Sequence, residues 1–357
     1  MSPDDTVDVP ASLIAAGMLP YGLQDIEQVR LVLRGDSVVD WQRLSFGDLA
    51  QVNECLIRVG LDPSNPLDAQ RLVDVHRRSV EYFQTHYATE LPAEVRRPHD
   101  VREVLLLASR PGPAQRAACT ILKVMHIVHH AAGRELLYRL PVAINELFHR
   151  IEIEVFTAVD GMKEVGIQVA ELAASRKSQD SIITKLLSRA DSVAADVHDR
   201  LRFRVITETL EDLFAALVYM SRRLLPFNYV VPGESRNDLV DLPATMQRDP
   251  RLASLLPLLQ PVAQSEDHIA RANLFSASGF RMINFVVDFP VRIEEWADRI
   301  LDFDAARSGQ VVFLLVEFQL VDRETHQLNN TGDNRHSLYK ERQRVRVFQR
   351  LVGQRRD

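Results

Sequence analysis

The sequence contains few cysteines and few glycines, and each shortage argues against a class of protein. Its two cysteines, Cys55 and Cys119, lie far apart in stretches with the apolar spacing of helices. We predict that both are small core residues, which argues against a disulfide framework or a thiolate-rich zinc site. Glycine occurs only 14 times. Phosphate-binding loops, the G-x-G-x-x-G fingerprint and the G-x-S-x-G elbow are all missing, which disfavours the enzymes built on them.

The chain also lacks a long apolar run and an excess of positive charge. No run approaches the length needed to cross a bilayer, and the N-terminus, "MSPDDTVDVP", is acidic and polar, so we expect a cytoplasmic protein with no membrane partner. The formal net charge of −6 does not favour nucleic-acid binding. The exception is the C-terminal end, where residues 346–357 form a basic tail. This tail is typical of a solvated helix end, although it is also able to contact phosphate or an acidic protein.

The first half of the chain has the apolar spacing of helices. From about Leu23 to Val159, stretches such as "DAQRLVDVHRRSVEYF" and "AQRAACTILKVMHIVHHAAGRELL" place apolar residues at helical intervals. Prolines fall between these stretches, where helix boundaries are expected. A chain of 357 residues is long enough for two domains, and we predict that residues 1–159 form an all-helical N-terminal region.

The second half predicts a domain of mixed α and β structure over residues 160–345. "RLRFRVIT" alternates as a strand between two helical stretches, "SQDSIITKLLSRADSVAADV" and "LEDLFAALVYMSRRLL". After an irregular insertion at about 227–277, two runs rich in β-forming residues, "FRMINFVVDFPVRI" and "QVVFLLVEFQLVD", flank a predicted helix, "EEWADRILDF". The fold class is therefore α+β, with at least three strands in a mixed sheet flanked by helices.

Two histidine groups suggest metal chemistry, and both have simpler explanations. His126 and His130 lie one helical turn apart, which suits a zinc pair, but His126 is not followed by the glutamate that a zinc-peptidase helix requires. The adjacent His99 and Asp100 resemble the centre of a metal-dependent phosphohydrolase site, yet other metal ligands at recognisable places are missing. Helix capping by Asp100 explains this pair more simply.

Glu317 lies inside the apolar run "VVFLLVEFQLVD" and needs a physical reason. A buried ionised carboxylate is costly unless it meets a cation, a metal or several hydrogen-bond donors. In a sheet with one solvated face, Glu317 and Gln319 would share that face, opposite Val316 and Phe318. The strand alone therefore leaves two readings open, a solvated strand face and a metal or substrate ligand.

Further charged residues lie on the segments around the predicted strands. Asp199 begins the strand that carries Arg204, while Glu317 lies on the last strand. Three cations precede Asp199, at the entry to a helix: Arg176, Lys177 and Lys185. Two carboxylates beside cations suit metal-assisted phosphoryl transfer, because the acids hold Mg²⁺ and the cations neutralise phosphate charge. A chain with 49 acidic and 43 basic residues offers many such sets, so the spacing alone is weak evidence.

Five blocks of the sequence occur in a characteristic order. They are "RKSQDSIITK", "DRLRFRVITETLEDLF", "SGFRMINFVV", "VEFQL" and "HSLYK". Taken together they resemble the RelA/SpoT-type nucleotidyltransferases, the synthetase domain of alarmone enzymes. In that family a basic ATP-side segment, an Asp-x4-Arg strand, a glycine–aromatic block, a Glu-x-Gln strand and a His-x-x-Tyr-Lys ending follow one another. The resemblance covers about residues 176–340.

The resemblance implies a role for each matching residue. Asp199 and Glu317 would hold magnesium, and Glu317 would also activate an acceptor ribose hydroxyl. The donor side, which contacts ATP, would consist of Arg176, Lys177, Ser181, Lys185 and Arg204. The acceptor side would consist of Arg236, Phe280, Asn284, Gln319, His336, Tyr339 and Lys340. The implied reaction transfers pyrophosphate from ATP to the ribose 3′ hydroxyl of a nucleotide, by family default GDP or GTP, as in (p)ppGpp synthesis during the stringent response.

Several departures from the family pattern leave the acceptor and the activity open. Asn284 stands where the family has a histidine, and Phe280 where it has a tyrosine that stacks on the acceptor base. Relatives use adenine nucleotides or tRNA 3′ ends, although the net acidic charge disfavours tRNA. The alternatives are a catalytically degenerate nucleotide-binding regulator on the same fold and a toxin-like relative that modifies adenine nucleotides or tRNA 3′ ends. A third reading treats the helical half as an interaction module that covers and neutralises the site. A homo-oligomer is compatible with each of these readings.

Overall fold

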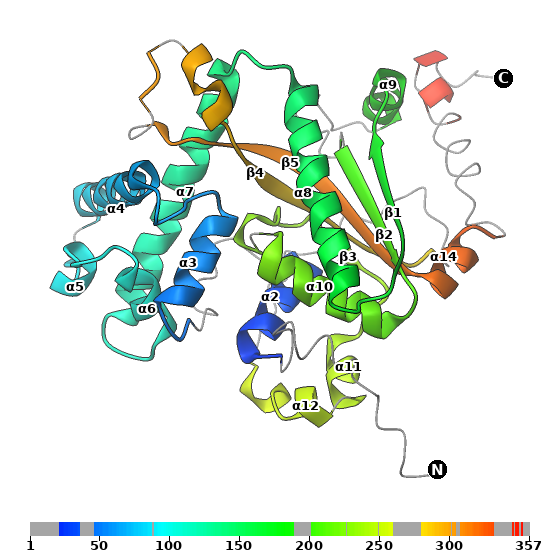
Figure 1. Ribbon diagram of the computed structural model, residues 1–357, viewed down its shortest axis with the longest axis horizontal. Coiled ribbons are helices and arrows are strands. Elements are labelled where there is room, and N and C mark those ends of the chain that lie inside the picture. Colours follow the sequence, from blue (N-terminus) through cyan, green and yellow to red (C-terminus); the bar gives the residue numbers. More distant parts are fainter. Residues whose placement is uncertain are drawn as a thin grey trace.

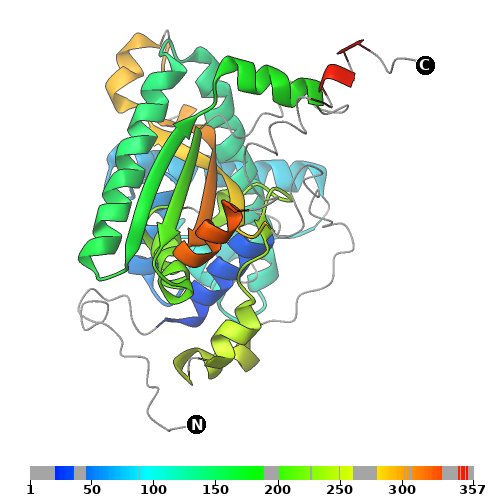
Figure 2. The same cartoon turned by 90° about the vertical axis from the view of Figure 1, so that its right-hand side faces the viewer.

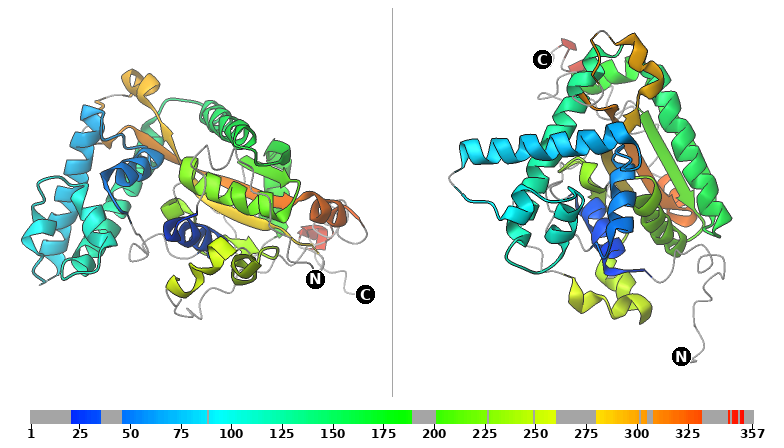
Figure 3. Two further views of the ribbon diagram at one scale, coloured as in Figure 1. Left: turned by 60° about the horizontal axis from the view of Figure 1, so that its bottom comes forward. Right: turned by 60° about the vertical axis from the view of Figure 1, so that its left-hand side comes forward.

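The computed structural model describes residues 21–35, 46–87, 89–188, 201–225, 227–248, 250–259, 280–300, 302–304 and 308–331, together with 345, 347–349 and 351–352. Helices gather at one end of this structure, and a five-stranded sheet with its own helices forms the other end (Figures 1 and 3). The predicted α+β class, with a helical region ahead of a mixed sheet, is confirmed.

Two of the helices ahead of the sheet, α3 and α4, begin at side-chain caps. The Asp48 carboxylate accepts a hydrogen bond from the Gln51 amide, and the Asn65 side chain accepts one from the Leu67 amide. The helices in this part are α2 (Leu23–Arg34), α3 (Leu49–Arg58), α4 (Pro66–His86), α5 (Ala93–Arg96), α6 (Glu103–Ser109), α7 (Gln115–Arg139) and α8 (Ile144–Glu164). We call α3 to α7 the helical lobe, which forms one end of the molecule in Figure 3.

The sheet has the strand order β1-β2-β5-β4-β3. Its strands are β1 (Val169–Arg176), β2 (Leu201–Thr207), β3 (Arg236–Asn237), β4 (Ile283–Arg292) and β5 (Val311–Asp322). Strands β2 and β5 run parallel, whereas the other neighbours are antiparallel. The remaining elements are α9 (Gln179–Ser188), α10 (Leu210–Arg223), η3 (Phe227–Tyr229), α11 (Leu242–Arg248), α12 (Pro250–Ala253), η4 (Leu256–Leu258), η5 (Glu294–Arg299) and α14 (Arg323–Asn329).

One face of the sheet is an apolar layer. Phe203, Phe285 and Phe318 come from three neighbouring strands, are fully buried, and stack with ring centroids 5.5 and 5.6 Å apart. Helix α8 lies along the sheet (Figure 2), and α10 also packs on β2 and β5. Because side chains alternate along a strand, Glu317 and Gln319 point to the opposite face.

Strands β4 and β5 are longer than their neighbours and extend as a two-stranded ribbon into the helical lobe. There the Phe313 ring packs against α7 at Gly133, which has no side chain to hold the two elements apart. At the end of β4, Arg292 Nη1 donates to the Gly60 carbonyl at 2.7 Å and to Asp68 Oδ2 at 2.6 Å. The ribbon is therefore part of the sheet and also packs against the helical lobe.

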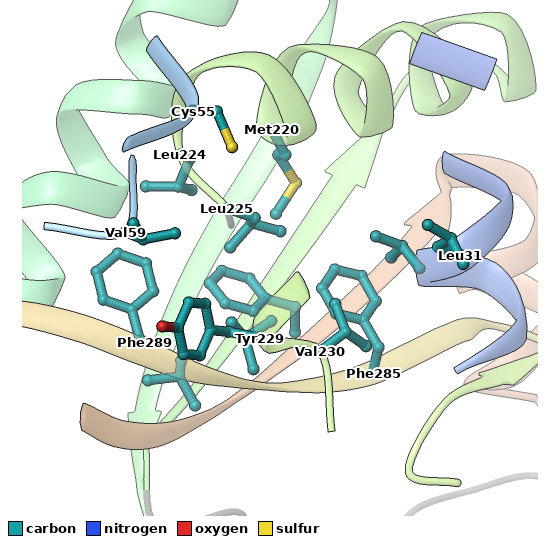
Figure 4. Packing of buried hydrophobic residues seen from close by; sticks show 14 of the residues in the cluster. Leu31, Cys55, Val59, Met220, Leu224, Leu225, Tyr229, Val230, Phe285 and Phe289 are labelled. Carbon is teal, nitrogen blue, oxygen red and sulfur yellow. The ribbon is translucent and has the colours of Figure 1, made fainter. Parts of the chain in front are cut away.

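The buried side chains form one continuous core across both ends of the molecule. Figure 4 shows Cys55 and Val59 of the helical lobe beside Leu224, Tyr229 and other residues that follow or precede the strands. Cys55 and Cys119 are both buried and unpaired, as predicted from their apolar surroundings. No helix in the described part of the chain is both long and apolar enough to cross a membrane.

The predicted strands are confirmed, and two details differ. The segment "EEWADRILDF" begins as a short 3₁₀ helix, η5, rather than an α-helix. Strand β1 was not predicted, because "VAELAASR" contains alanine, serine and glutamate in place of the β-branched residues that mark a strand. Its antiparallel pairing with β2 makes it a strand.

Candidate functional site

The parallel pairing of β2 with β5 places two arginines opposite two polar residues. The register sets Arg202 across from Glu317 and Arg204 across from Gln319. Residues directly paired across two strands point to the same face of a sheet. This face therefore carries two adjacent polar pairs. In each pair the two residues are 115 positions apart in the sequence.

Glu317 is buried and hydrogen-bonded through both of its oxygens. The side chain is only 9% exposed, and Oε2 accepts a hydrogen bond of 2.7 Å from Arg202 Nε. Oε1 accepts a bond of 3.0 Å from the Gln319 amide. Of the two readings of Glu317, a solvated strand face is therefore wrong, because the carboxylate is inside the protein and paired with a cation.

The second pair extends into a row across four strands. Arg204 donates from Nε at 3.1 Å and from Nη2 at 2.9 Å to the Gln319 side-chain oxygen. Gln319 is paired across the sheet with Asn284, and Asn284 with Arg236. We call Arg204, Gln319, Asn284 and Arg236 the polar row. The structure thus brings together five predicted site residues, namely the polar row and Glu317.

Burial and nearby charges lower the pKa of two residues in and beside the polar row, Arg204 and His326. Burial lowers the pKa of Arg204, and the positive charge of Arg202 lowers it further, while Glu317 and Glu171 act in the opposite direction. His326 of α14 has a lowered pKa because it is partly buried and because Arg204 lies near it. His326 is therefore neutral at pH 7 and adds no further positive charge.

The predicted donor-side residues lie at the end of β1 and on α9. Arg176 donates to Glu152 of α8 at 2.9 and 2.7 Å, and it shares the face of Leu201 rather than that of Glu317. The Ser181 amide and hydroxyl both contact the Ser178 hydroxyl, which caps α9. Lys177 lies just before α9 and Lys185 within it. Their contact with ATP stays a prediction.

The structure describes only some of the predicted acceptor-side residues. Phe280 is half-buried and lies immediately ahead of β4. Arg236 forms an ion pair with Asp238, and the buried Oδ1 atom of Asn284 has no hydrogen-bond partner. The other predicted members of the site, Asp199, His336, Tyr339 and Lys340, lie outside the described residues.

The described residues do not by themselves fit a magnesium site. Magnesium prefers several oxygen ligands in octahedral geometry, and Glu317 alone supplies too few of them. No group of three histidine, cysteine or acidic side chains able to hold a metal occurs within the described ranges. Asp199, the second predicted ligand, lies outside those ranges.

Arg202 is a residue of the candidate site that the sequence analysis did not predict. "RLRFR" alternates, so Arg202 and Arg204 share a face of their strand. Which strand lies beside them was not readable from the sequence, since β2 and β5 are far apart along the chain. The pairing of Arg202 with Glu317 therefore became visible only with the register.

The two histidine groups have structural explanations. His126 and His130 stack with centroids 6.0 Å apart, and His130 lies 2.5 Å from the Asp288 carboxylate of β4. Asp100 accepts hydrogen bonds from the amide and guanidinium of Arg102, just ahead of α6. Both groups thus hold the helical lobe together or attach it to the sheet.

No family model and no curated protein matches the chain. Small alarmone synthetases, which the sequence blocks resemble, are among the solved structures that do. Small alarmone synthetase 1 from Bacillus subtilis is 12% identical, with 56% of this chain and 84% of that chain covered and a TM-score of 0.29. The same protein bound to its product pppGpp gives 11% identity, 58% and 89% coverage and a TM-score of 0.31.

A GTP pyrophosphokinase family protein from Streptococcus pneumoniae also matches. It is 15% identical, with 61% of this chain and 87% of that chain covered and a TM-score of 0.28. With TM-scores below 0.5, these matches carry no weight in the assignment of function, which rests on the chain's own residues.

Proposed function

We propose that this protein is a pyrophosphotransferase of the alarmone-synthetase type, which moves pyrophosphate from ATP to the ribose 3′ hydroxyl of a nucleotide acceptor. The observation that carries the proposal is the Glu317 carboxylate, which is buried in the sheet between Arg202 and Gln319. Glu317, Gln319, Arg204 and Asn284 lie in sequence blocks whose order resembles that of the RelA/SpoT-type nucleotidyltransferases. GDP and GTP are the first acceptors to test.

The described residues suit binding, charge neutralisation and proton transfer. Arg204 and Arg236 place positive charge on the same face as Glu317, where it stabilises a transferring phosphoryl group. Glu317 is the residue that accepts the proton of the attacking hydroxyl. Magnesium remains a prediction based on the resemblance and on Asp199.

A transfer assay tests this proposal. The full chain is incubated with Mg²⁺, ATP labelled in its terminal phosphates, and GDP, GTP, ADP or uncharged tRNA in separate reactions. We expect label in one nucleotide product together with an equal amount of AMP. Failure of every acceptor, with nucleotide binding unaffected by Glu317→Gln and Arg204→Gln, would sink the proposal.

One observation favours a second candidate, a nucleotide-binding regulator without turnover. Each oxygen of Glu317 already accepts a hydrogen bond from a side chain of the sheet, and the ion pair with Arg202 stabilises the unprotonated carboxylate, which makes it a weaker base. Calorimetry separates the two candidates: micromolar affinity for ATP or a guanine nucleotide, without AMP release over hours, identifies a regulator. Release of AMP that depends on the acceptor identifies the enzyme.

A further inference from the structure

The helical lobe packs on the same face of the sheet that carries the candidate site. On β5, Phe313 and Glu317 share a face, because side chains alternate along a strand and an even number of positions separates the two. The Phe313 ring packs against α7 at Gly133, and α7 crosses the β4–β5 ribbon there (Figure 1). The lobe therefore covers this face at a point close to Glu317 along the strand.

Two positions of β4 flank Glu317 on this face. Glu317 is directly paired with Val286, so Asn284 and Asp288 are its two diagonal neighbours, each about 7–8 Å away. Asn284 belongs to the polar row, whose two arginines supply positive charge on one side of Glu317. Asp288 lies on the other side, where the lobe begins.

Asp288 is held in place by α7 of the lobe. Its side chain is 9% exposed, and its Oδ2 atom lies 2.5 Å from His130 Nε2. The His130 ring packs edge-on against the rings of Phe313 and Tyr229, with centroids 5.0 and 5.7 Å away. The hydrogen bond with His130 therefore fixes the Asp288 carboxylate beneath α7.

Arg134, one helical turn after His130, carries a positive charge at this border of the lobe. Its side chain is 39% exposed, and Nη1 lies 3.7 Å from Asp288 Oδ1, which is too long for a hydrogen bond. Among the residues that the structure describes, the Arg134 guanidinium makes no hydrogen bond. An arginine has five N–H donors in a planar fork that matches two oxygens of a phosphate group.

We propose that Arg134 binds the phosphate chain of a nucleoside di- or triphosphate, so that the helical lobe contributes to the nucleotide site. This inference rests on the proposed function for the identity of its ligand. Transfer between two nucleotides brings two phosphate chains together, and each chain requires positive charge. Arg204 and Arg236 supply this charge on one side of Glu317, and Arg134 supplies it on the other.

The chain contains a matched control for Arg134. Arg150 of α8 is 47% exposed, and its Nε atom lies 3.6 Å from Glu295 Oε1, so it too forms a loose and half-exposed ion pair. Helix α8 lies on the other side of the sheet, because its Glu152 bonds Arg176, which shares the face of the apolar layer. Arg150→Gln therefore removes the same charge away from the proposed nucleotide site.

Isothermal titration calorimetry of the full-length chain with AMP, ADP and ATP, and with GMP, GDP and GTP, tests the inference. We expect Arg134→Gln to weaken triphosphate binding by about tenfold or more, as for the loss of one charged hydrogen-bonding partner, and to weaken monophosphate binding much less. Arg134→Lys keeps the charge without the planar fork, so its affinity is expected to lie between those of Arg134→Gln and the wild type. Arg150→Gln is expected to bind every nucleotide as the wild type does.

Circular dichroism shows whether each variant is folded, and Arg134→Met replaces Arg134→Gln if the latter is not. Equal affinities of the Arg134 variant and the wild type overturn the inference. A loss of the same size for one and for three phosphates also overturns it, as does an equal loss in Arg150→Gln or a wild-type chain that binds none of these nucleotides.

The calorimetry and the transfer assay together separate this inference from the proposed function. A loss that grows with the number of phosphates, in a protein that transfers no pyrophosphate to any acceptor, keeps this inference and refutes the enzymatic proposal. Pyrophosphate transfer by the wild type, with unchanged nucleotide affinity in the Arg134 variant, does the opposite.

Discussion

At the scale of single residues, Glu317 shows what a carboxylate requires inside a strand. Its neighbours Val316 and Phe318 are fully buried, so the chain cannot turn to bring Glu317 to solvent. Its charge is instead balanced across the sheet by Arg202 at 2.7 Å. A buried pair of this kind adds little net stability, because desolvation offsets the attraction, and its presence points to function.

The first prediction concerns Glu317→Gln. The amide keeps the size of the side chain and one acceptor oxygen, but it carries no charge and does not accept a proton. We expect pyrophosphate transfer to fall by about 100-fold or more, which is the range for loss of a general base, while the melting temperature changes little. Initial rates of AMP release under saturating ATP measure the effect.

Glu324→Gln provides the control for this substitution. Glu324 is exposed on α14, close in sequence to the end of β5, and its change removes the same charge from the surface. We expect its activity to equal that of the wild type. Equal losses in both variants would show that net charge, rather than the position of Glu317, determines the rate.

At the scale of elements, the close contact between α7 and β5 depends on a glycine, Gly133, at the point where they meet. A Cβ on Gly133 would lie 2.5 Å from the Phe313 ring and 2.8 Å from the Val311 carbonyl oxygen. Both distances are too short for a real contact, and the backbone oxygen has little freedom to move. The close packing of helix and strand therefore requires glycine at this position.

We predict that Gly133→Ala destabilises the protein by roughly 1–3 kcal/mol, the range for overpacking a core. Helix propensity alone predicts the opposite sign, a gain of about 1 kcal/mol. Urea unfolding measures the difference. Gly112→Ala is the control, because nothing lies within 4 Å of an added Cβ there. A stable Gly133→Ala variant would mean that α7 does not lie against β5 as described.

A second element-scale prediction concerns the attachment of the β4–β5 ribbon to the helical lobe. Arg292→Leu removes the cation that pairs with Asp68, whose side chain is 2% exposed. We expect a loss of about 3 kcal/mol, because a buried carboxylate is left without its partner. Chemical denaturation followed by circular dichroism measures it.

Arg77→Leu on α4 gives the comparison for this loss. Arg77 forms surface ion pairs with Asp74 and Glu81, and surface pairs contribute at most about 1 kcal/mol. We expect a change of less than about 1 kcal/mol. A similar loss in both variants would contradict the view that Arg292 fastens the ribbon to the lobe.

The elements were predictable where the local pattern decides the structure. Strands β4 and β5 have continuous apolar runs and were predicted from them, as were α4 and α7 from their helical spacing. Strand β1 was missed because its residues favour no strand and its backbone is paired on one side by β2. Tertiary pairing, rather than local preference, makes it a strand.

At the scale of the whole molecule, the stability is expected to depend on pH through two histidines of α7. Burial lowers the pKa of His126 and of His129 to about 3. Because the folded pKa lies below the unfolded value of about 6.5, the unfolded chain binds more protons between these values. The contribution of each histidine is intact above about pH 6.5 and is lost progressively as the pH falls toward about 3.

We therefore predict that the free energy of unfolding falls by about 2 kcal/mol per histidine between pH 7 and pH 5. Urea unfolding at a series of pH values measures it. Carboxylates also contribute in this range, so the decisive quantity is the difference from a variant with His126→Gln and His129→Gln. That variant is expected to lose most of the slope above pH 5. An unchanged slope would show that other groups cause it.

Several residues of the candidate site were predictable from the sequence, but the contacts between them were not. Glu317, Gln319 and Arg204 were chosen from sequence blocks, and the structure places them on one face of the sheet. The ion pair with Arg202 depends on which strands are neighbours, and no local pattern encodes the adjacency of β2 and β5. The roles of the remaining predicted residues stay predictions.

The β4–β5 ribbon has a consequence for how this protein can be divided. The ribbon packs against the sheet's own helix α10 and also against the helical lobe, through Gly133 on Phe313 and Asp68 on Arg292. Truncation before residue 159 would remove the partners of Phe313 and Arg292 and expose apolar strand to solvent. We expect the two ends to melt in a single cooperative transition, so point substitutions on the lobe surface, rather than its deletion, are the sound way to ask whether the lobe restrains the site.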